Sequence, residues 1–495
     1  MKPLDDEERL LEKLREKLGA PKKQDERAEL ERLFGKREKN DEDRLRAKLV
    51  KPSVQVGDII DITIEKLAFG GEAIGRYKNY PVFVTGAVPG DTVRVRLTKV
   101  AQDMCRAEII EFTAKSSNRI PAECPRFGVC GGCHLQCLVY TAQLKAKEDM
   151  MADVLSRIGG IDIAIRNVVG SPEKVAYRIR TRLHVDVINN KIITGYYAGQ
   201  SHDLVPIDHC PLLTKPLNNI IAVLPELLPL PGTAPIPEEI QLQMSMDGGN
   251  VVMYLIGKDL YGVETIFEKS KKLGLPITGV IQEKNGERAG DATLTHRVGK
   301  YQFRVTADVF FQANHYLHKK LIDQVLQLSS PSANDTILDL YCGCGFFSLP
   351  LAPFAQSLIG MDNNPSAIED AIFNAEQANV SNVKFFVADD KGFFNHPSIK
   401  QSMFSLVIVD PPRQGLSSET IKGIIALKPE KLMYISCDPA TLARDLRILA
   451  ESDFRVRVIQ PMDMFPQTYH LENLVFLTHK YTSSQAAYRA FSDLR

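Results

Sequence analysis

The sequence predicts a small β-barrel, a mixed α+β region and a doubly wound α/β sheet, in that order along the chain. Short β-type runs joined by turn motifs fill residues 52–113, which is typical of a small barrel. Apolar runs separated by helix-length segments alternate after residue 300, as they do in a parallel sheet with helices on both faces. These runs lie at 336–340, 358–361, 383–387, 406–409 and 432–435. We place the boundaries of the four segments at 1–51, 52–113, 114–300 and 301–495.

Composition excludes several classes of protein. The chain has 495 residues with 61 Lys and Arg against 61 Asp and Glu, so it is neither a basic nucleic-acid coat protein nor an acidic disordered chain. No apolar run approaches the length of a membrane-spanning helix, and the first residues have no apolar core typical of a secretory signal. Nine cysteines, an odd number, indicate ligands, nucleophiles or buried thiols of an intracellular protein. We therefore expect a cytoplasmic, monomeric chain with no membrane contact.

The first segment, 1–51, is dominated by charge. Of its first 50 residues, 15 are basic and 14 are acidic. Leu10, Leu14 and Leu18 recur at helical spacing, so short amphipathic helices are expected on either side of Pro21. A solvated extension is the preferred interpretation, and an arm that contacts RNA or a ribosome is the alternative.

The second segment, 52–113, carries three turn motifs in a fixed order. They are Val-Gly-Asp at 56–58, Gly-Gly-Glu-Ala-Ile-Gly-Arg at 70–76 and Val-Pro-Gly-Asp at 88–91. This order resembles the TRAM domain, an OB-like RNA-binding β-barrel. Since the segment is nearly neutral, any RNA contact would use a local face with Arg76, Lys78, Arg94 and Arg96. The alternative is a structural barrel that makes no RNA contact.

The third segment, 114–300, begins with cysteines and continues with a helical stretch over 138–158. Arg178, Arg180 and Arg182 then follow at a spacing of two. On a strand these side chains would project from one face and could contact phosphates. The alternative is a solvated edge strand that carries charge. Further strand signals at 240–244 and 251–255 flank a turn at 247–250.

The first apolar run of the fourth segment ends in a Gly-x-Gly turn at Gly343 and Gly345, preceded by Asp339. A glycine there lets a ligand approach the backbone closely. Asp362 ends the second run and Asp389 follows the third, positions suited to the ribose and the adenine of a nucleoside. Ser348 stands where a dinucleotide-binding loop would have its third glycine. The pattern favours a cofactor with a cationic amino-acid tail and is similar to class I, Rossmann-like methyltransferases that bind S-adenosylmethionine.

Two further positions lie where parallel strands should end beside the cofactor crevice. Asp410 follows the fourth run and Cys437 follows the fifth. Asp438 is suited to cap the next helix and Pro439 to begin it. The positive end of that helix favours a thiolate at Cys437, whereas the carboxylate of Asp438 opposes it.

Five motifs together resemble the RNA 5-methyluridine methyltransferase family (RumA/TrmA type). They are Phe-Gln-Ala-Asn at 311–314, the loop at 339–345, Asp-Pro-Pro-Arg-Gln-Gly-Leu at 410–416, the stretch at 436–445, and Asp-Met-Phe-Pro at 463–466 with His470 and Glu472. With the barrel, the resemblance covers residues 52–480.

The resemblance implies a thiol-dependent methylation of uracil C5. Cys437 would be the nucleophile that adds to C6, and Glu472 the base that removes the C5 proton. The remaining pocket residues implied are Gln312, Tyr341, Asp362, Asp389 and Asp410, with Asp410 also close to the uracil. Two positions depart from the family pattern. Phe346 stands where Asn or Thr is common, and Asp362 where Glu is common, which should weaken or shift the ribose contact.

Cys124, Cys130 and Cys133 form a compact triple that needs a fourth soft ligand, with Cys105, Cys137 and Cys210 as candidates. Spacing alone leaves zinc and a [4Fe–4S] cluster open. The triple resembles the iron–sulfur site of the RumA-like branch, which implies Cys210 as the fourth ligand and a structural or RNA-positioning role.

The predicted function is S-adenosylmethionine-dependent methylation of uracil C5 in a structured RNA. The resemblance to the iron–sulfur branch favours 23S ribosomal RNA. The alternatives are the same chemistry on transfer RNA, or a non-catalytic iron–sulfur protein that binds RNA.

Overall fold

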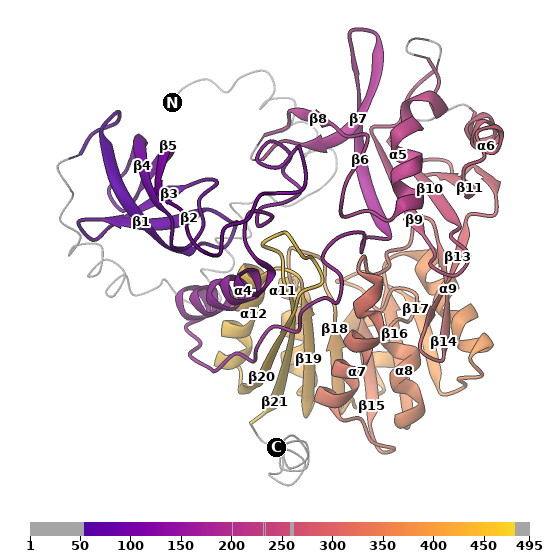
Figure 1. Cartoon of the computed structure of the whole chain (residues 1–495). Helices are drawn as coiled ribbons and strands as arrows, with labels where there is room; N and C mark the ends of the chain where they lie inside the picture. Colours follow the sequence, from indigo (N-terminus) through magenta and orange to yellow (C-terminus); the bar gives the residue numbers. More distant parts are fainter. Residues whose placement is uncertain (1–53, 200, 231, 233, 258–261, 481–495) are drawn as a thin grey trace, which may run out of the picture.

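The computed structural model describes residues 54–199, 201–230, 232, 234–257 and 262–480 (Figure 1). The predicted charged extension at 1–51 lies outside the described residues. Within them, no helix is both long enough and apolar enough to cross a membrane. Three bodies meet around a common centre in Figure 1, and each contains one of the predicted sheets.

The N-terminal body is a closed five-stranded barrel with the strand order β1-β2-β3-β5-β4. Its strands are β1 (Ile59–Leu67), β2 (Ala73–Tyr77), β3 (Tyr80–Val84), β4 (Thr92–Val100) and β5 (Cys105–Ala114). Alternate residues of β1 point inward and are buried, which is the period expected of a strand with one face in a core. Asp91, fully buried in the turn before β4, pairs with Arg119 and so ties the barrel to the segment that follows it.

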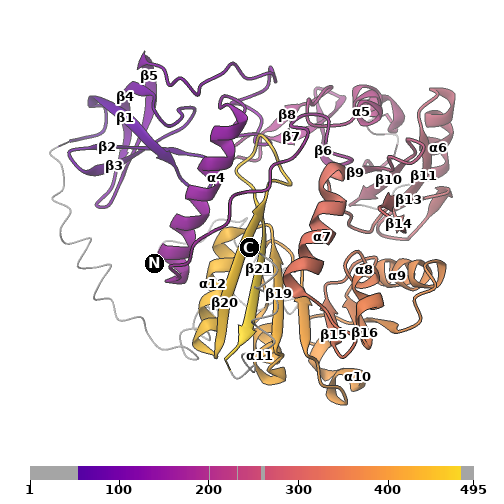
Figure 2. The same cartoon turned by 60° about the horizontal axis from the view of Figure 1, so that its bottom comes forward.

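Helix α4 (Tyr140–Val154) leaves the barrel and lies against the C-terminal body, called the catalytic body below because it carries the predicted catalytic residues (Figure 2). It continues as one wide π-type turn, Leu155–Gly159, which packs against helix α12 (Pro439–Glu451). Gly160 ends the helix in the left-handed conformation that glycine tolerates best. The predicted helix over 138–158 is confirmed to within two residues, although its last turn is not α-helical.

The central body is a seven-stranded sheet of order β12-β11-β10-β9-β6-β7-β8. Its elements are β6 (Arg180–Ile188), β7 (Lys191–Tyr197), β8 (Leu204–Pro206), α5 (Lys215–Leu227), β9 (Glu239–Met244), β10 (Val251–Ile256), α6 (Val263–Lys272), β11 (Ile277–Gln282) and β12 (Arg288–Gly290). Asn189 and Asn190, both with positive φ, close the β6–β7 hairpin, which projects from the molecule in Figure 1. Strand β6 begins at Arg180, so the predicted run of three arginines on one strand is wrong for Arg178, which lies before the strand.

A separate hairpin, β13 (Thr293–Val298) and β14 (Tyr301–Thr306), spans the boundary predicted between residues 300 and 301. Its β14 strand packs against helix α9 (Pro365–Gln377) of the catalytic body, where Arg304 pairs with the buried Asp370 at 2.6 Å. The hairpin therefore belongs with the catalytic body in packing, a long-range relation that its local sequence does not show.

The catalytic body is a seven-stranded sheet of order β17-β16-β15-β18-β19-β21-β20, in which only β21 runs antiparallel to its two neighbours. Its strands are β15 (Thr336–Leu340), β16 (Ser357–Asp362), β17 (Val383–Val387), β18 (Leu406–Val409), β19 (Lys431–Ser436), β20 (Phe454–Met462) and β21 (Glu472–His479). Its helices are α7 (His318–Ser329), α8 (Ser348–Leu351), α9 (Pro365–Gln377), α10 (Pro397–Lys400), α11 (Ser418–Leu427) and α12 (Pro439–Glu451), with short 3₁₀ turns at His315–Leu317, Ala352–Phe354 and Phe393–Asn395.

The five predicted strands of this sheet are confirmed. Inner strands such as β18 and β19 are continuous apolar runs buried between helices, whereas β17, at the edge of the sheet, leaves Lys384 and Val387 exposed. The chain order reverses between β15 and β18, so a crevice opens at the carboxyl ends of these two strands. This crevice is the place at which the predicted cofactor and catalytic residues meet.

Candidate active site

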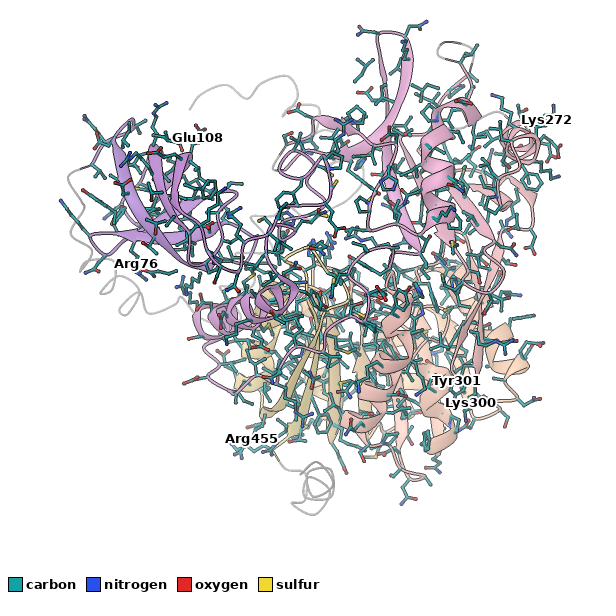
Figure 3. The ribbon with its side chains drawn as sticks, in the orientation of Figure 1. Arg76, Glu108, Lys272, Lys300, Tyr301 and Arg455 are labelled. Carbon is teal, nitrogen blue, oxygen red and sulfur yellow. The ribbon has the colours of Figure 1, made fainter. Side chains whose placement is uncertain are left out.

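One large cleft of about 1900 Å³ lies where the three bodies meet. Figure 3 shows the side chains that crowd this junction, while the labelled Arg76 lies on the outer side of the barrel. Twelve of the predicted site residues line the cleft: Cys124, Cys130, Cys133, Cys210, Gln312, Tyr341, Gly343, Asp362, Asp389, Asp410, Cys437 and Glu472. These residues come from segments up to about 350 positions apart in the sequence, and the fold brings them into one space.

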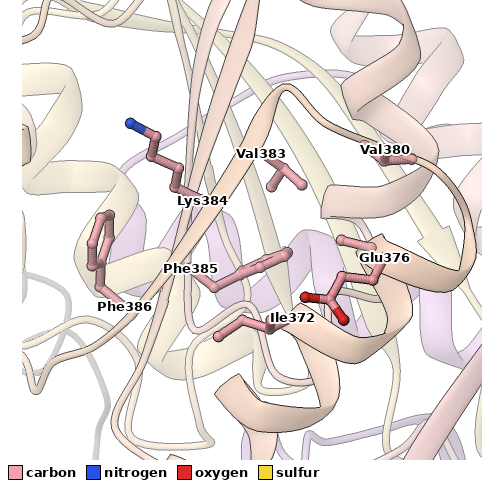
Figure 4. A pocket seen from close by; sticks show the side chains of 8 residues that line it. Ile372, Glu376, Val380, Val383, Lys384, Phe385 and Phe386 are labelled. Carbon is pink, nitrogen blue, oxygen red and sulfur yellow. The ribbon is translucent and has the colours of Figure 1, made fainter.

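A second hollow, of about 300 Å³, lies between α9 and β17 (Figure 4). Apolar side chains such as Ile372, Val383 and Phe385 line it, together with the carboxylate of Glu376. None of the predicted site residues lies there.

The loop after β15 is shaped for a close approach by a ligand. Tyr341 has φ 62°, an uncommon conformation for a side chain of its size. Gly343 has φ 54°, with open space where a Cβ would stand, and its N–H donates to Asp362 Oδ2 at 2.9 Å. Asp362, at the end of β16, also accepts from the N–H of Asn364 at 2.9 Å. The loop and the start of α9 are thus held together by the carboxylate predicted to meet the ribose.

Gly345, predicted with Gly343 as a cofactor residue, does not line the cleft. It has φ 83°, and a Cβ there would lie 2.4 Å from Leu349 Cδ1. The glycine is required by the backbone conformation and by the packing of α8 against the loop.

Asp339, buried beneath the loop, accepts from the hydroxyl of Ser348 at 2.5 Å, while its other oxygen has no partner. Burial raises the pKa of Asp339 to about 7. Ser348, which stands where a dinucleotide-binding loop would have its third glycine, therefore acts as a hydrogen-bond donor to this carboxyl group.

After β17, the two adjacent aspartates differ in their surroundings. Asp389 is exposed and accepts from the N–H of Gly392 at 2.8 Å, which fixes the turn. Asp390 lies closer to Tyr341, and its carboxylate contributes, after burial, to a raised pKa of that phenol. Both line the cleft, so either side chain can meet a ligand above Tyr341.

Cys437 lies between β19 and α12. The carboxylate of Asp438 accepts from the N–H groups of Ala440 and Thr441 at 2.9 and 3.0 Å, and Pro439 begins the helix. The predicted cap is therefore confirmed. Burial raises the pKa of the Cys437 thiol to about 12, with smaller contributions from the Glu472 and Asp410 carboxylates, whereas Arg413 lowers it. The thiol is neutral in this site until a proton acceptor or a cation changes its surroundings.

Glu472 is the first residue of β21, beside Cys437. The register of β21 on β19 pairs Asn473 with Ser436, so the residues just beyond this pair, Glu472 and Cys437, meet at the cleft. Burial and the neighbouring Asp410 raise the pKa of Glu472 well above its usual range, and one of its oxygens has no hydrogen-bond partner. Burial, together with Asp339 and Asp362, raises the pKa of Asp410 to about 8. The site thus pairs a thiol with two carboxyl groups that are set to exchange protons.

His470 also lines the cleft but lies before the strand. Burial lowers its pKa to about 3, so it is a neutral imidazole in this site.

The four cysteines predicted as metal ligands line the cleft on the side of the central body. Cys130 and Cys133 lie on a loop whose Gly131 N–H donates to the carbonyl of Tyr197, and Cys210 is fixed to α5 through Asn218. Burial raises the pKa of Cys133 to about 11, to which Cys210 and Cys130 add. All nine cysteines are free thiols. Among the described residues, however, no three metal-ligating side chains lie close enough to share one metal ion.

Sequence reasoning missed several residues of the cleft. Phe310, about half exposed, lines it beside Gln312, and an exposed aromatic side chain next to the quoted motif was a usable signal. Arg413 stood within a quoted motif without an assigned role. Lys147, which does not line the cleft but binds the segment before Glu472, gave no signal because its partners lie more than 300 residues away.

Comparisons with known proteins agree with this geometry. The family model described as tRNA (Uracil-5-)-methyltransferase matches residues 290–480, which include the β13–β14 hairpin, and the TRAM domain model matches residues 53–110. An uncharacterized RNA methyltransferase of Halalkalibacterium halodurans is 31% identical over 450 residues, which cover 86% of this chain and 98% of the relative. An uncharacterized RNA methyltransferase of Bacillus cereus is 30% identical, with 86% and 98% covered.

A solved structure is also similar. The Pyrococcus abyssi tRNA (uracil-54, C5)-methyltransferase, in complex with S-adenosyl-L-homocysteine, superposes with a TM-score of 0.62 at 26% identity, covering 84% of this chain and 100% of that one. The barrel is accordingly a TRAM domain, and the C-terminal sheet has the fold of S-adenosylmethionine-dependent methyltransferases. The chain belongs to the RNA (uracil-5-)-methyltransferase family of S-adenosylmethionine-dependent enzymes.

Proposed function

We propose that this enzyme methylates C5 of uracil in a structured RNA, with Cys437 as nucleophile and Glu472 as base. The observation that carries the proposal is the meeting of Cys437, Glu472 and Asp410 at the mouth of the cofactor loop. C5 of uracil is a weak nucleophile, and addition of a thiolate to C6 makes C5 nucleophilic. A nearby base is then needed to remove the C5 proton.

The residues act in a definite order. The Cys437 thiol loses its proton to a neighbouring carboxylate, and its sulfur bonds to C6. S-adenosylmethionine supplies a methyl group on a cationic sulfur, which C5 takes up. The Glu472 carboxylate then removes the C5 proton, the C5–C6 double bond forms again and the C6–S bond breaks. Asp410, buried beside both residues, is placed to stabilise a cation or to bind an N–H of the uracil.

Gln312, Tyr341, Gly343, Asp362 and Asp389 would hold the cofactor. Asp362 is suited to the ribose because its carboxylate ends β16 in the cleft. The side chain of Asp362 is shorter than that of glutamate, which should weaken the ribose contact. The hydrogen bond from the Gly343 N–H, which fixes the carboxylate in place, partly offsets this loss.

Cys124, Cys130, Cys133 and Cys210 would hold a [4Fe–4S] cluster. The four thiols line one cleft. Cys124, Cys130 and Cys133 each interact electrostatically with Cys210. A single zinc ion needs all four sulfurs at about 2.3 Å from one point, whereas each cluster thiolate binds a different iron. The resemblance of these four cysteines to the iron–sulfur branch, and not their spacing, favours the cluster over zinc. When bound, the cluster supplies a rigid link between the cysteine loop and α5, with no step of the methyl transfer routed through it.

We favour ribosomal RNA as the substrate, because the cysteine set resembles the iron–sulfur branch. Transfer RNA is the second candidate, favoured by the similarity to the Pyrococcus abyssi tRNA (uracil-54, C5)-methyltransferase. The test uses labelled S-adenosylmethionine with unmodified 23S ribosomal RNA and unmodified transfer RNA in separate reactions. The proposal expects 5-methyluridine in the ribosomal RNA alone, and label in transfer RNA alone would contradict it.

A further inference from the structure

The wall of the cleft that the central body contributes is basic. Arg126, Arg178, Arg180 and Arg182 line it, and no acidic residue of this body does. The acids that line the cleft come from the catalytic body, apart from Glu72 of the barrel, which pairs with Arg106. The cleft therefore has an acidic side, where the cofactor loop lies, and a basic side opposite.

The arginines on the basic side differ in their partners. Arg182 pairs with Glu239 at 3.1 Å. Arg178 donates to the Tyr177 hydroxyl at 3.2 Å and faces the thiols of Cys133 and Cys210. Arg180 has no carboxylate partner in the described residues. Its guanidinium lies 4.8 Å from the centre of the Phe310 ring and donates to the side-chain oxygen of Gln241, and its Nε has no partner.

We propose that Arg180 binds a phosphodiester of the RNA substrate. A largely buried guanidinium without an anion is costly, and a phosphate in the cleft would offset that cost. The Phe310 ring and Gln241 fix the plane of the guanidinium, which leaves its remaining N–H groups for a ligand. Burial, with Arg182 nearby, lowers the pKa of Arg180 to about 10, as expected for a cation that lacks a counter-ion. This inference rests on the proposed function in one respect: the proposed function identifies the phosphate-bearing ligand as RNA.

The test measures the affinity of unmodified 23S ribosomal RNA for wild-type, R180Q and R180K protein over a range of KCl concentrations. R455Q is the matched control, because Arg455 is an exposed arginine of β20 that does not line the cleft and lies at the far end of the catalytic sheet in Figure 3. We expect R180Q to lower affinity by about tenfold and to reduce the salt slope by about one, with partial recovery in R180K and little change in R455Q. Binding of S-adenosylhomocysteine, measured by calorimetry, should not change.

An unchanged salt slope in R180Q, with wild-type protein that binds the RNA, would overturn the phosphate site alone. A wild-type protein that binds neither ribosomal nor transfer RNA would contradict the proposed function as well.

A second, independent observation concerns the loop at 463–471, which joins β20 to Glu472. Figure 1 shows this loop, in yellow, rising from the sheet beside α4. Lys147 of α4 is fully buried and donates to Asp463 Oδ1 at 2.6 Å, to the carbonyl of Phe465 at 3.0 Å and to the carbonyl of His470 at 2.9 Å. An ammonium group has three N–H donors, so the loop satisfies all of them.

Other bonds from the same segment hold this loop. Tyr140 donates to Asp463 at 3.0 Å, and Gln143 exchanges hydrogen bonds with Gln467 at 2.9 and 3.1 Å. The N–H groups of His134 and Leu135, directly after Cys133, both donate to the Gln467 carbonyl at 2.9 Å. Cys437, by contrast, is held by the cap of α12 and makes none of these bonds.

We infer that Lys147 is a positioning residue for Glu472 and not for Cys437. Its loss would release the carbonyl of His470, two residues before the base, and would leave the thiol in place. The variant should therefore slow removal of the C5 proton more than formation of the C6–S bond. This inference rests on the proposed role of Glu472.

The test compares K147M with K145M, a matched control because Lys145 is exposed on the same helix and pairs with Asp149. Each variant is mixed with S-adenosylmethionine and either uridine RNA or 5-fluorouridine RNA, and the covalent protein–RNA adduct is quantified on denaturing gels. Fluorine at C5 cannot be removed as a proton, so that adduct forms without the base. K147M should accumulate adduct on uridine RNA with turnover reduced about tenfold or more, while its 5-fluorouridine adduct stays near the K145M amount.

K147M leaves the buried Asp463 carboxylate without its partner, which can unfold the chain. The double variant K147M/D463N removes both charges and should show the same accumulation. A parallel fall of both adducts in the folded double variant, or turnover equal to that of K145M, would overturn the positioning role. Absence of the 5-fluorouridine adduct in wild-type protein would instead contradict the proposed function.

Discussion

The chemistry of the cleft depends on carboxyl groups that are buried beside one another. Burial raises the pKa of all three reactive groups; Asp339 and Asp362 add to the effect at Asp410, Asp410 adds to it at Glu472, and Glu472 and Asp410 add to it at Cys437. A site with these pKa values holds its protons until a cation or a substrate enters. The charge of the methyl donor therefore favours ionisation of the site at the moment when a thiolate and a base are needed.

Asp410 makes the stability of the ligand-free protein depend on pH. Its pKa is about 8 in the fold and near 3.9 in the unfolded chain, so between these values the unfolded state binds fewer protons and the free energy of unfolding falls as pH rises. D410N removes this dependence. We expect D410N to raise the melting temperature more at pH 8 than at pH 5, by calorimetry. D389N, which changes an exposed carboxyl group of the same cleft, is the control, and an equal effect of D410N at both pH values would contradict the account.

Sequence reasoning singled out the proposed reacting residues because each stands in a local pattern. Cys437 follows a buried strand and precedes a cap, and Asp410 ends the neighbouring strand. The same reasoning placed Arg178 on a strand and Gly345 among the cofactor residues. A spacing of two residues does not show where a strand begins, and a Gly-x-Gly turn does not show which of its glycines lines the cleft. Only the tertiary packing shows that Gly345 faces Leu349.

Helix α12 positions the proposed nucleophile, because its cap adjoins Cys437. Asp438 satisfies two N–H groups at the start of this helix, and its charge also adds to the raised pKa of the thiol. The capping hydrogen bonds stabilise the start of the helix that positions Cys437, whereas the negative charge of Asp438 raises the pKa of the Cys437 thiol. Two substitutions of Asp438 separate these effects.

D438A should lower the free energy of unfolding by about 0.5–2 kcal/mol, since both capping bonds are lost. D438N keeps the cap without the charge, so it should retain stability and form the 5-fluorouridine adduct faster than wild-type protein near pH 7. Chemical denaturation and adduct kinetics measure the two effects. Adduct formation in D438N slower than in wild-type protein, at unchanged stability, would count against a charge effect on the thiol.

Strands were predictable wherever burial on both faces produced a continuous apolar run, as in β18 and β19. The wide turn at Leu155–Gly159 was not predictable, because it follows from packing against α12. The β13–β14 hairpin has ordinary hairpin signals, and nothing local assigns it to one body rather than the other.

At the scale of the whole molecule, the cleft exists only because three bodies meet. The barrel contributes Gly70 and Glu72, the cysteine loop and central sheet contribute thiols and arginines, and the catalytic sheet contributes the acids. Two of the barrel arginines expected to meet RNA, Arg76 and Arg94, pair with acids of the barrel itself. The neutral total charge of the chain thus does not show how the charges are distributed. Arg76 and Arg94 on the barrel surface pair with acids, whereas Arg180 inside the cleft has no carboxylate partner among the described residues.

The cysteine loop should confer a visible spectroscopic signature. Protein purified without air should be brown, with broad absorption near 400 nm (roughly the region of sulfide-to-iron charge transfer) and with iron and sulfide in about equal amounts. C210S should lose this absorption, because it removes the ligand that joins the loop to α5. A colourless wild-type preparation that contains zinc would contradict the iron–sulfur assignment.

The central claim is that Cys437 forms a covalent bond to uracil C6 within this cleft. The most direct measurement is mass spectrometry of peptides from wild-type protein incubated with S-adenosylmethionine and 5-fluorouridine-substituted ribosomal RNA. The account predicts a methylated fluorouridine nucleotide attached to the peptide that contains Cys437, and no adduct in C437A. An adduct on another cysteine, or methyl transfer by C437A, would contradict it.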